Sequence, residues 1–185
     1  MDRAAEYRSE YHDGQMFAMS GGSNEHSKIG GNLYAEFRSA LRGSGCEPNN
    51  SDMRLRIPGT RSYVYPDLLI RCGENARTPG DIADSPVLIA EVLSPSTELF
   101  DRGAKFRKYR TIESLREYVL VSQDEPLVEA FSRQQDGSWR LAITRGLDSS
   151  IRIDSLGCEI PLAGVYENVA IPEPADDEPP VPSLP

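Results

Sequence analysis

Cysteine is scarce in this chain: its 185 residues include three, Cys46, Cys72 and Cys158, which lie far apart and form no C-x-x-C pair. This spacing fits neither a disulfide framework nor a zinc site, so we expect buried, reduced thiols. Long apolar runs are also missing, since none approaches the roughly 18 residues that a membrane-spanning helix needs. The charged N-terminus lacks the apolar stretch of a signal peptide. These absences predict a soluble, cytoplasmic protein without membrane contact.

Positive charge is also in short supply. The chain has 20 Lys and Arg against 29 Asp and Glu, which gives a formal net charge of −9 at pH 7. Proteins that bind nucleic acid indiscriminately carry a basic footprint, so this balance disfavours that class. It does not exclude an enzyme that acts on nucleic acid, because a short basic strip can still engage phosphates.

Several catalytic signatures are absent as well. The chain has no G-x-x-x-x-G-K-[ST] phosphate loop, no G-x-S-x-G elbow and no H-E-x-x-H zinc motif. The pairs Gly21-Gly22 and Gly30-Gly31 do not form a dinucleotide fingerprint, and no histidine neighbours a cysteine. The sequence therefore disfavours phosphate-loop, serine-elbow, zinc-peptidase and thiol chemistry.

What is present is the composition of one folded domain. Apolar residues make up 38% of the chain, and with its 15 glycines this is ordinary for a globular protein. We place the domain at residues 1–171. The segment 172–185 is rich in proline and acid and has no basic residue, so we expect a disordered tail.

The spacing of apolar residues predicts the first elements. Two short strands around Asp13-Gly14 are typical of an N-terminal β-hairpin. A helix follows, capped by Ser23 or Asn24 and ended by Gly43-Ser-Gly45. Its apolar stripe recurs every four residues and consists of Ile29, Leu33, Phe37 and Leu41.

Further strands are predicted over 52–57, 62–71, 86–94, 117–122, 127–132 and 139–144. Pro66 indicates that the second of them is an edge strand or contains a bulge. The third is apolar almost throughout, which is typical of a central strand buried on both faces. A second helix is predicted over 94–114, and a turn at Asp136-Gly137 joins the last two strands. The fold class is therefore mixed α/β or α+β, with a mixed β-sheet flanked by helices.

Glu91 is the most informative residue, because it lies inside the apolar strand 86–94, where a carboxylate loses its water. An isolated buried charge is prohibitive, so the group must be paired, protonated or bound to a metal. A second acid, Asp67, is also flanked by strand-forming residues. If the two strands are neighbours, both carboxylates point to one spot, and a divalent cation would relieve their repulsion. Oxygen ligands of this kind suit Mg²⁺ or Mn²⁺.

The second helix is densely basic. Lys105 comes four residues after Asp101 and four before Tyr109, so these three share a helix face. A helix packed beside the Glu91 strand would bring Lys105 to the metal site, where its charge would stabilise a developing phosphate anion. Three more basic residues of this helix are candidates to guide a nucleic-acid backbone: Arg102, Lys108 and Arg110.

Each of these features also has an ordinary interpretation. A strand glutamate can face solvent or pair with an arginine, for which the candidates are Arg54, Arg56 and Arg71. The basic helix can be a solvated face with an internal acid–lysine pair. His26 lies beside Glu25 in the first turn of the first helix and is a base, a ligand or an ordinary helix-face residue.

Six short motifs follow one another in a fixed order. They are Glu10-Tyr-x-x-Gly14, Asn24-Glu-His26, Pro66-Asp67, Glu91-Val-Leu-Ser-Pro-Ser-Thr97, Asp101-x-x-x-Lys105-x-x-x-Tyr109 and Glu117-Tyr-Val-Leu-Val121. The fourth, followed at fixed spacing by the fifth, is the most specific. This series resembles the Uma2 family of restriction-endonuclease-like proteins, and the resemblance covers roughly residues 6–170.

The resemblance implies a fold and a set of site residues. The family belongs to the PD-(D/E)xK nuclease superfamily, whose core is a mixed sheet flanked by helices. Asp67 then matches the first acid and Glu91 the second, which together would hold Mg²⁺ or Mn²⁺. The lysine expected two residues after the second acid is Leu93 here, and the resemblance implies that Lys105 replaces it. Glu25 or His26 would complete the site from the first helix.

The resulting hypothesis is a metal-dependent endonuclease that hydrolyses phosphodiester bonds of nucleic acid, with DNA as the expected substrate and a homodimer as the expected assembly. The acidic charge and the missing strand lysine leave an alternative, a catalytically inactive module that keeps the nuclease fold for oligomerisation or partner binding. A third option is hydrolysis of a small phosphate ester, which would need no DNA-binding surface.

Overall fold

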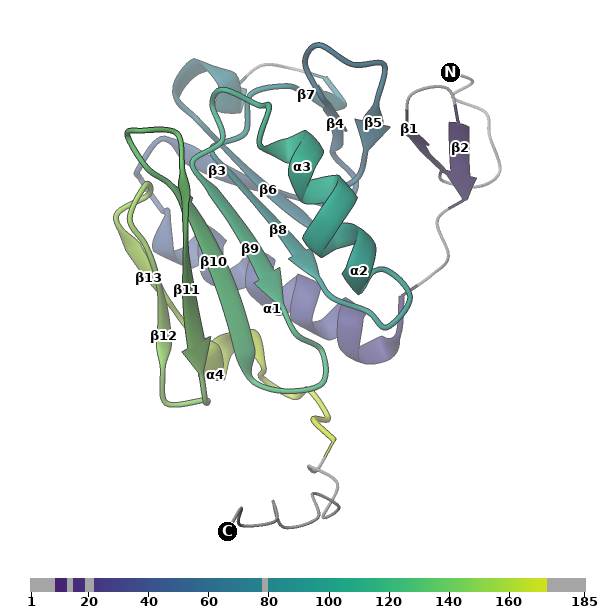
Figure 1. Cartoon of the computed structure of the whole chain (residues 1–185). Helices are drawn as coiled ribbons and strands as arrows, with labels where there is room; N and C mark the ends of the chain where they lie inside the picture. Colours follow the sequence, from purple (N-terminus) through teal and green to yellow (C-terminus); the bar gives the residue numbers. More distant parts are fainter. Residues whose placement is uncertain (1–8, 13–14, 19–21, 78–79, 173–185) are drawn as a thin grey trace, which may run out of the picture.

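The computed structural model describes residues 9–12, 15–18, 22–77 and 80–172 (Figure 1). Its centre is a six-stranded sheet in the order β11-β10-β9-β8-β6-β3. These strands are β3 (Cys46–Asn50), β6 (Leu68–Cys72), β8 (Leu88–Val92), β9 (Glu117–Val121), β10 (Leu127–Arg133) and β11 (Trp139–Arg145). β8 and β9 run parallel and the other neighbours are antiparallel, so the sheet is mixed, as predicted.

The central strands are buried on both faces. All five residues of β8 and all five of β9 are buried, which explains their continuous apolar runs. Because successive side chains point to opposite faces, Leu88 and Ala90 join one hydrophobic core and Ile89 joins the other. Glu91 therefore points to the same face as Ile89.

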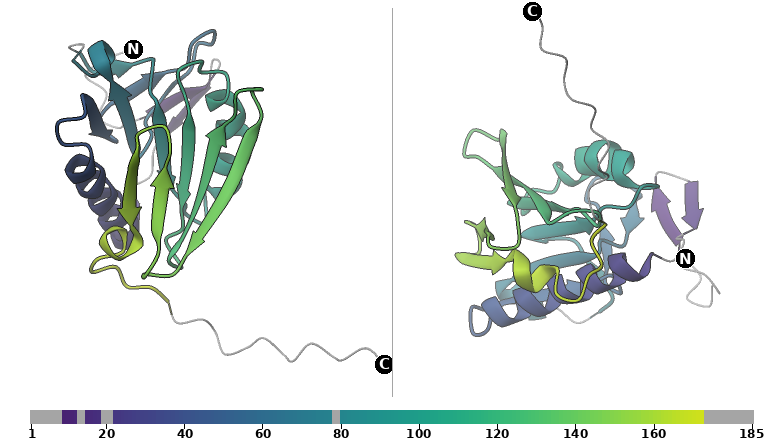
Figure 2. Two further views of the ribbon diagram at one scale, coloured as in Figure 1. Left: turned by 90° about the vertical axis from the view of Figure 1, so that its left-hand side faces the viewer. Right: turned by 90° about the horizontal axis from the view of Figure 1, so that it is seen from below.

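One face of the sheet is covered by α1 (Asn24–Ala40), as the view from below shows (Figure 2). Ser23 is the N-cap, since its side chain accepts a hydrogen bond from the His26 N–H at 3.0 Å. The predicted stripe of α1 is buried in this core. The same core contains residues of three C-terminal elements, β12 (Ser150–Ile153), β13 (Cys158–Pro161) and α4 (Leu162–Val165).

The opposite face carries the second helix, which runs through α2 (Glu98–Phe100), the π-helical η2 (Asp101–Lys105) and α3 (Phe106–Tyr109). It is shorter than the predicted 94–114. The Thr111 hydroxyl donates to the carbonyl of Lys108 at 2.7 Å, where the helix ends. Ile112 and Leu115 then turn onto the sheet and are buried in the second core.

A smaller sheet has the order β2-β1-β5-β4-β7. It consists of β1 (Ser9–His12), β2 (Gln15–Ala18), β4 (Arg54–Arg56), β5 (Tyr63–Val64) and β7 (Ile82–Ala83). The pairing of β1 with β2 confirms the hairpin strands, whereas Asp13-Gly14 lies outside the described residues. The single strand predicted over 62–71 is wrong, because the chain leaves the small sheet after β5 and enters the large sheet at β6. Pro66, which has no N–H to donate, lies at this break.

Some elements were not predicted. β3 contains Pro48, Asn49 and Asn50, which are depleted in strands, and the two-residue β7 is too short to give a pattern. A short 3₁₀ helix, η1 (Gly73–Arg77), follows β6. The expected tail lies almost wholly in 173–185, outside the described residues. None of the described helices has the length and apolar character to cross a membrane.

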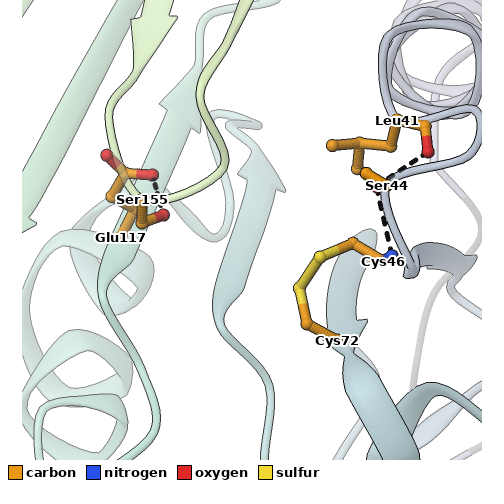
Figure 3. Close-up of a disulfide and its surroundings, with 6 residues drawn as sticks. All are labelled: Leu41, Ser44, Cys46, Cys72, Glu117 and Ser155. Carbon is orange, nitrogen blue, oxygen red and sulfur yellow. Dashed lines mark hydrogen bonds between the residues drawn. A yellow bond between two sulfur atoms is a disulfide. The ribbon is translucent and has the colours of Figure 1, made fainter.

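Cys46 and Cys72 form a disulfide, which corrects the expectation of reduced thiols for these two residues (Figure 3). The register of the antiparallel pair β3 and β6 sets them directly opposite each other, with Cα atoms 4.0 Å apart. Without β3, the sequence gives no reason to pair them across 26 residues. Cys158 is a free, half-buried thiol.

Candidate active site

Asp67 and Glu91 meet across two neighbouring central strands. Leu68 pairs with Ala90, so Asp67, just before β6, lies opposite Glu91 in β8. The N–H of Asp67 donates to Glu91 Oε2 at 3.4 Å, and the N–H of Val92 donates to Asp67 Oδ2 at 2.8 Å. The Glu91 side chain is 4% exposed and that of Asp67 is 20% exposed, so the pair opens to solvent at Asp67.

The second helix turns its predicted shared face toward Glu91. Lys105 Nζ lies 2.9 Å from Glu91 Oε1, and the Tyr109 hydroxyl donates to the same oxygen at 2.8 Å. Asp101 Oδ1 lies 3.3 Å from Lys105 Nζ. The buried carboxyl of Glu91 is therefore held by two donors from one helix, which satisfies the requirement for a partner.

Burial and charge act together on the pKa values of this cluster. Burial raises the pKa of Glu91 to about 8, against the opposing effect of Lys105. Burial also raises the pKa of Asp101. Burial opposes the charge of Lys105, but the carboxylates of Glu91, Glu10 and Asp101 outweigh it and raise the lysine pKa above its ordinary value. The ammonium therefore stays charged at neutral pH, and burial makes the Glu91 carboxyl a weaker acid than an exposed glutamate.

The arginine alternative for Glu91 is wrong, since its cationic partner is Lys105. The three candidate arginines bind elsewhere. Arg54 donates to the Tyr65 hydroxyl, Arg56 pairs with Asp84, and Arg71 donates to Asn49 and to the carbonyl of Asn75.

The first helix brings His26 to the acids. His26 Nε2 lies 3.4 Å from Asp67 Oδ2, and hydrogen bonding to Asp67 raises the pKa of this histidine. Glu25 points elsewhere: within the described residues its side chain accepts a hydrogen bond from Asn24 at 3.2 Å and makes no hydrogen bond or ion pair with Asp67 or Glu91. Its own backbone N–H and Asn24 lower the pKa of Glu25. Proximity therefore favours His26 over Glu25 as a site residue.

The three basic candidates of the second helix lie outside this cluster. Arg102 pairs with Glu98 at 2.7 Å and also with Glu129. Lys108 Nζ lies 3.5 Å from the Ser62 hydroxyl. The guanidinium of Arg110 lies over the Phe106 ring, 5.4 Å from its centroid. In the part of the chain that the structure describes, none of the three contacts Asp67 or Glu91.

Sequence reasoning did not assign a site role to Asp101, Tyr109 or Glu10. The spacing of Asp101 and Tyr109 from Lys105 was the available signal, and both are buried. Glu10 gave no comparable signal beyond its motif, because the hairpin that carries it meets the site only in the folded chain. Glu10 Oε1 lies 3.8 Å from Lys105 Nζ.

The donor set suits a hard divalent cation. Within the described residues, Oδ1 of Asp67 has no hydrogen-bond or ion-pair partner, whereas Oδ2 has two. The same residues contain no group of three or more His, Cys, Asp or Glu side chains arranged to hold a metal. Mg²⁺ is commonly held by one or two carboxylates and completes its shell with water and substrate phosphates. Asp67 and Glu91 therefore fit Mg²⁺ or Mn²⁺ rather than a fully ligated zinc.

The chain is similar to several known proteins. The model of the Uma2 family, described as "Putative restriction endonuclease", matches residues 1–163. The Synechocystis protein slr1290 is 36% identical over 163 residues, which is 88% of this chain and 85% of that protein. A second Synechocystis protein, sll1609, is 34% identical over 152 residues, which is 81% of this chain and 86% of that protein. Both relatives are described as uncharacterized.

A crystal structure from Anabaena variabilis, described as "a putative nuclease belonging to DUF820", has a similar fold. The TM-score is 0.72 at 15% identity, with 88% of this chain and 91% of that chain covered. At this identity the likeness shows the fold, and it confirms the predicted nuclease-like architecture.

Proposed function

Because the chain belongs to the Uma2 family, we propose that it is a metal-dependent endonuclease that hydrolyses phosphodiester bonds of nucleic acid, with DNA as its substrate. The family description and the structural neighbour support a restriction-endonuclease-like nuclease. The observation that carries the proposal is the meeting of Asp67 and Glu91, distant along the chain, beside the ammonium of Lys105.

Asp67 and Glu91 would hold Mg²⁺ or Mn²⁺. When bound, such a cation supplies a Lewis acid that polarises a phosphoryl oxygen and lowers the pKa of an attacking water. Backbone N–H groups orient the two carboxylates before any cation binds. The Val92 N–H fixes one oxygen of Asp67, and the Asp67 N–H fixes one oxygen of Glu91. This preorganisation limits the cost of assembling the site.

Lys105 supplies positive charge where the phosphate becomes more negative in the transition state. Its ammonium is nearly buried, and a charge in such a place acts more strongly than one in water. Asp101 holds the ammonium from the preceding turn of the same helix. His26, in contact with Asp67, is the candidate to accept a proton from the attacking water, and Glu25 is the alternative from the same helical turn.

The nucleic acid would approach along the second helix. Arg102 already pairs with two glutamates, so we expect it to contribute fewer phosphate contacts; Lys108 and Arg110 are the other candidates on this helix. Because the whole chain carries a net charge of −9, we expect weak binding that depends on this local strip and falls with salt. We also propose that the protein acts as a homodimer.

Nicking of supercoiled plasmid in Mg²⁺ or Mn²⁺ tests the proposal. Asp67→Asn combined with Glu91→Gln removes both carboxylates and should abolish nicking. Asp84→Asn combined with Glu159→Gln removes two exposed acids elsewhere and should leave it unchanged. Single-stranded DNA, RNA and a mononucleotide ester tested in parallel separate a nuclease from a small-ester hydrolase. Nicking that persists in the variant without Asp67 and Glu91 would contradict the catalytic role assigned to these two acids.

A non-enzymatic module is the second candidate, favoured by Leu93 at the place of the strand lysine and by the ion pair that Lys105 already makes with Glu91. Calorimetry with Mn²⁺ separates the two candidates. The nuclease should take up Mn²⁺ in the wild type and lose this uptake when Asp67 and Glu91 are neutralised. A wild type that takes up no Mn²⁺ and cleaves none of the substrates would favour the module.

A further inference from the structure

The hairpin of β1 and β2 lies at the margin of the fold, away from the main sheet (Figure 1). Met16 of β2 is 69% exposed, as expected for a marginal element. Glu10 of β1 differs, because it is only 9% exposed although its side chain is ionisable. Burial of a carboxylate is costly unless it is paired, so the contacts of Glu10 must compensate for its burial.

Those contacts lead to both halves of the candidate site. Pairing of Tyr11 with Tyr63 sets the hairpin against β5. There Glu10 Oε1 accepts a hydrogen bond from the Tyr65 N–H at 3.1 Å and lies 3.8 Å from Lys105 Nζ. Tyr65 belongs to the segment that leads to Asp67, whereas Lys105 contacts Glu91. One carboxylate therefore links the hairpin to the loop of the first acid and to the lysine beside the second.

The Lys105 ammonium is shared by three carboxylates, each from a different element. Its Nζ lies 2.9 Å from Glu91 of β8, 3.3 Å from Asp101 of η2 and 3.8 Å from Glu10 of β1. One ammonium neutralises only one of these charges, so the cluster with Asp67 stays attractive to a divalent cation. Glu10 also attracts the ammonium away from Glu91. Lys105 therefore competes less strongly with a divalent cation for the Glu91 carboxylate.

We propose that Glu10 is a positioning residue of this site: it holds the Lys105 ammonium between the small sheet and the second helix and so leaves Glu91 available to a metal ion. The N-terminal hairpin then contributes a positioning residue to the site. This role of Glu10 extends the proposed function and rests on it for the catalytic purpose of the site. The position of Lys105, however, can be measured without any metal.

Glu10→Gln is the variant of choice, because its amide oxygen still accepts from the Tyr65 N–H while the charge that attracts Lys105 is lost. Glu159→Gln, which removes an exposed charge from β13, is the matched control. Carbamylation of Lys105 by cyanate in metal-free protein is followed by peptide mass spectrometry, with Lys28 as the internal reference. We expect the relative rate at Lys105 to rise about threefold in Glu10→Gln, as for the loss of one ion pair, and to be unchanged in Glu159→Gln.

Mn²⁺ calorimetry is the second readout, with affinity expected to fall about threefold in Glu10→Gln by the same ion-pair estimate. Glu10→Asp, which keeps the charge on a shorter stem, should lie between Glu10→Gln and the wild type in both measurements and replaces Glu10→Gln if that variant does not fold. Unchanged labelling of Lys105 in the folded variant overturns the positioning role. A wild type without Mn²⁺ uptake overturns the metal site of the proposed function, and the labelling then decides the role of Glu10 alone.

Discussion

At the scale of single residues, His26 is a titratable group that responds directly to the charge of Asp67. Its Nε2 lies 3.4 Å from Asp67 Oδ2, and its side chain is 22% exposed. Hydrogen bonding to Asp67 raises the pKa of His26, and this effect outweighs burial, which acts in the opposite direction. Folding therefore favours the protonated histidine, and this preference links stability to pH.

His26→Gln should lower the free energy of unfolding more at pH 5.5 than at pH 9. A group with a raised folded pKa contributes stability that is fully present below its unfolded pKa, about 6.5, and is lost as pH rises through the folded pKa. For a partly exposed pair we expect the pH-dependent part to be at most about 1 kcal/mol. Urea unfolding in EDTA across this pH range measures the difference from the wild type.

Lys28→Gln is the control on the same helix, because Lys28 donates to the carbonyl of Asn168 rather than to an acid of the candidate site. Its effect on unfolding should be the same at both pH values. If His26→Gln also changes the free energy of unfolding by the same amount at both pH values, the contact with Asp67 does not couple stability to protonation.

At the scale of elements, the second helix contains a π-helical turn, Asp101–Lys105, at the site itself. Such turns inside α-helices are frequent at functional sites. Gly103 lies in this turn, and a Cβ added there would meet no atom within 4 Å. Steric crowding therefore does not require glycine at this position. Replacing Gly103 can then measure how much the backbone flexibility of glycine costs in the free energy of unfolding.

Gly103→Ala should stabilise the protein by about 0.5–1 kcal/mol, because alanine loses less conformational freedom on entering a helix. Gly31→Ala is the matched control, since Gly31 lies in the regular helix α1 and a Cβ there is equally unobstructed. Urea unfolding of both variants should give gains of similar size. A loss in Gly103→Ala beside a gain in Gly31→Ala would contradict this expectation and would tie the glycine to the π-helical turn.

The elements differ in how well the sequence predicts them, and the reason is physical. β8, β9 and α1 bury whole runs or a whole stripe, so their own residues carry the signal. β3 is an edge strand whose pairing with β6 is fixed by the folded chain rather than by its own composition. The Cys46–Cys72 bond depends on that pairing and was missed with it.

The same distinction applies to the candidate site. Asp67, Glu91 and Lys105 stand out because an acid in an apolar strand, or a lysine spaced from Asp101 and Tyr109, is visible locally. The structure brings them together, and their catalytic roles stay predictions. Glu10 could not be assigned, because its place beside Lys105 depends on how a remote hairpin docks on β5.

At the scale of the whole molecule, β11 is an open edge of the main sheet, since β10 is its only partner among the described strands. Leu141 and Ile143 of this seven-residue strand are 43% and 53% exposed. Such an edge offers unpaired backbone groups to another chain. Antiparallel pairing of two β11 strands about Ala142 would set Leu141 opposite Ile143 of the second copy, so the proposed homodimer has a self-complementary surface.

Ile143→Lys should therefore convert the dimer to a monomer, because it places a charge in an apolar contact made twice across the two-fold axis. Light scattering measures the mass, and Leu147→Lys is the control, since Leu147 is similarly exposed, at 46%, but lies beyond the strand. A monomeric wild type, or an Ile143→Lys variant that remains dimeric, would contradict the β11 interface.

The two strands of a DNA duplex are themselves antiparallel, so a two-fold dimer could present one Asp67–Glu91 pair to each. Ile143→Lys should then still nick plasmid but yield less linear product than Leu147→Lys at equal nicking.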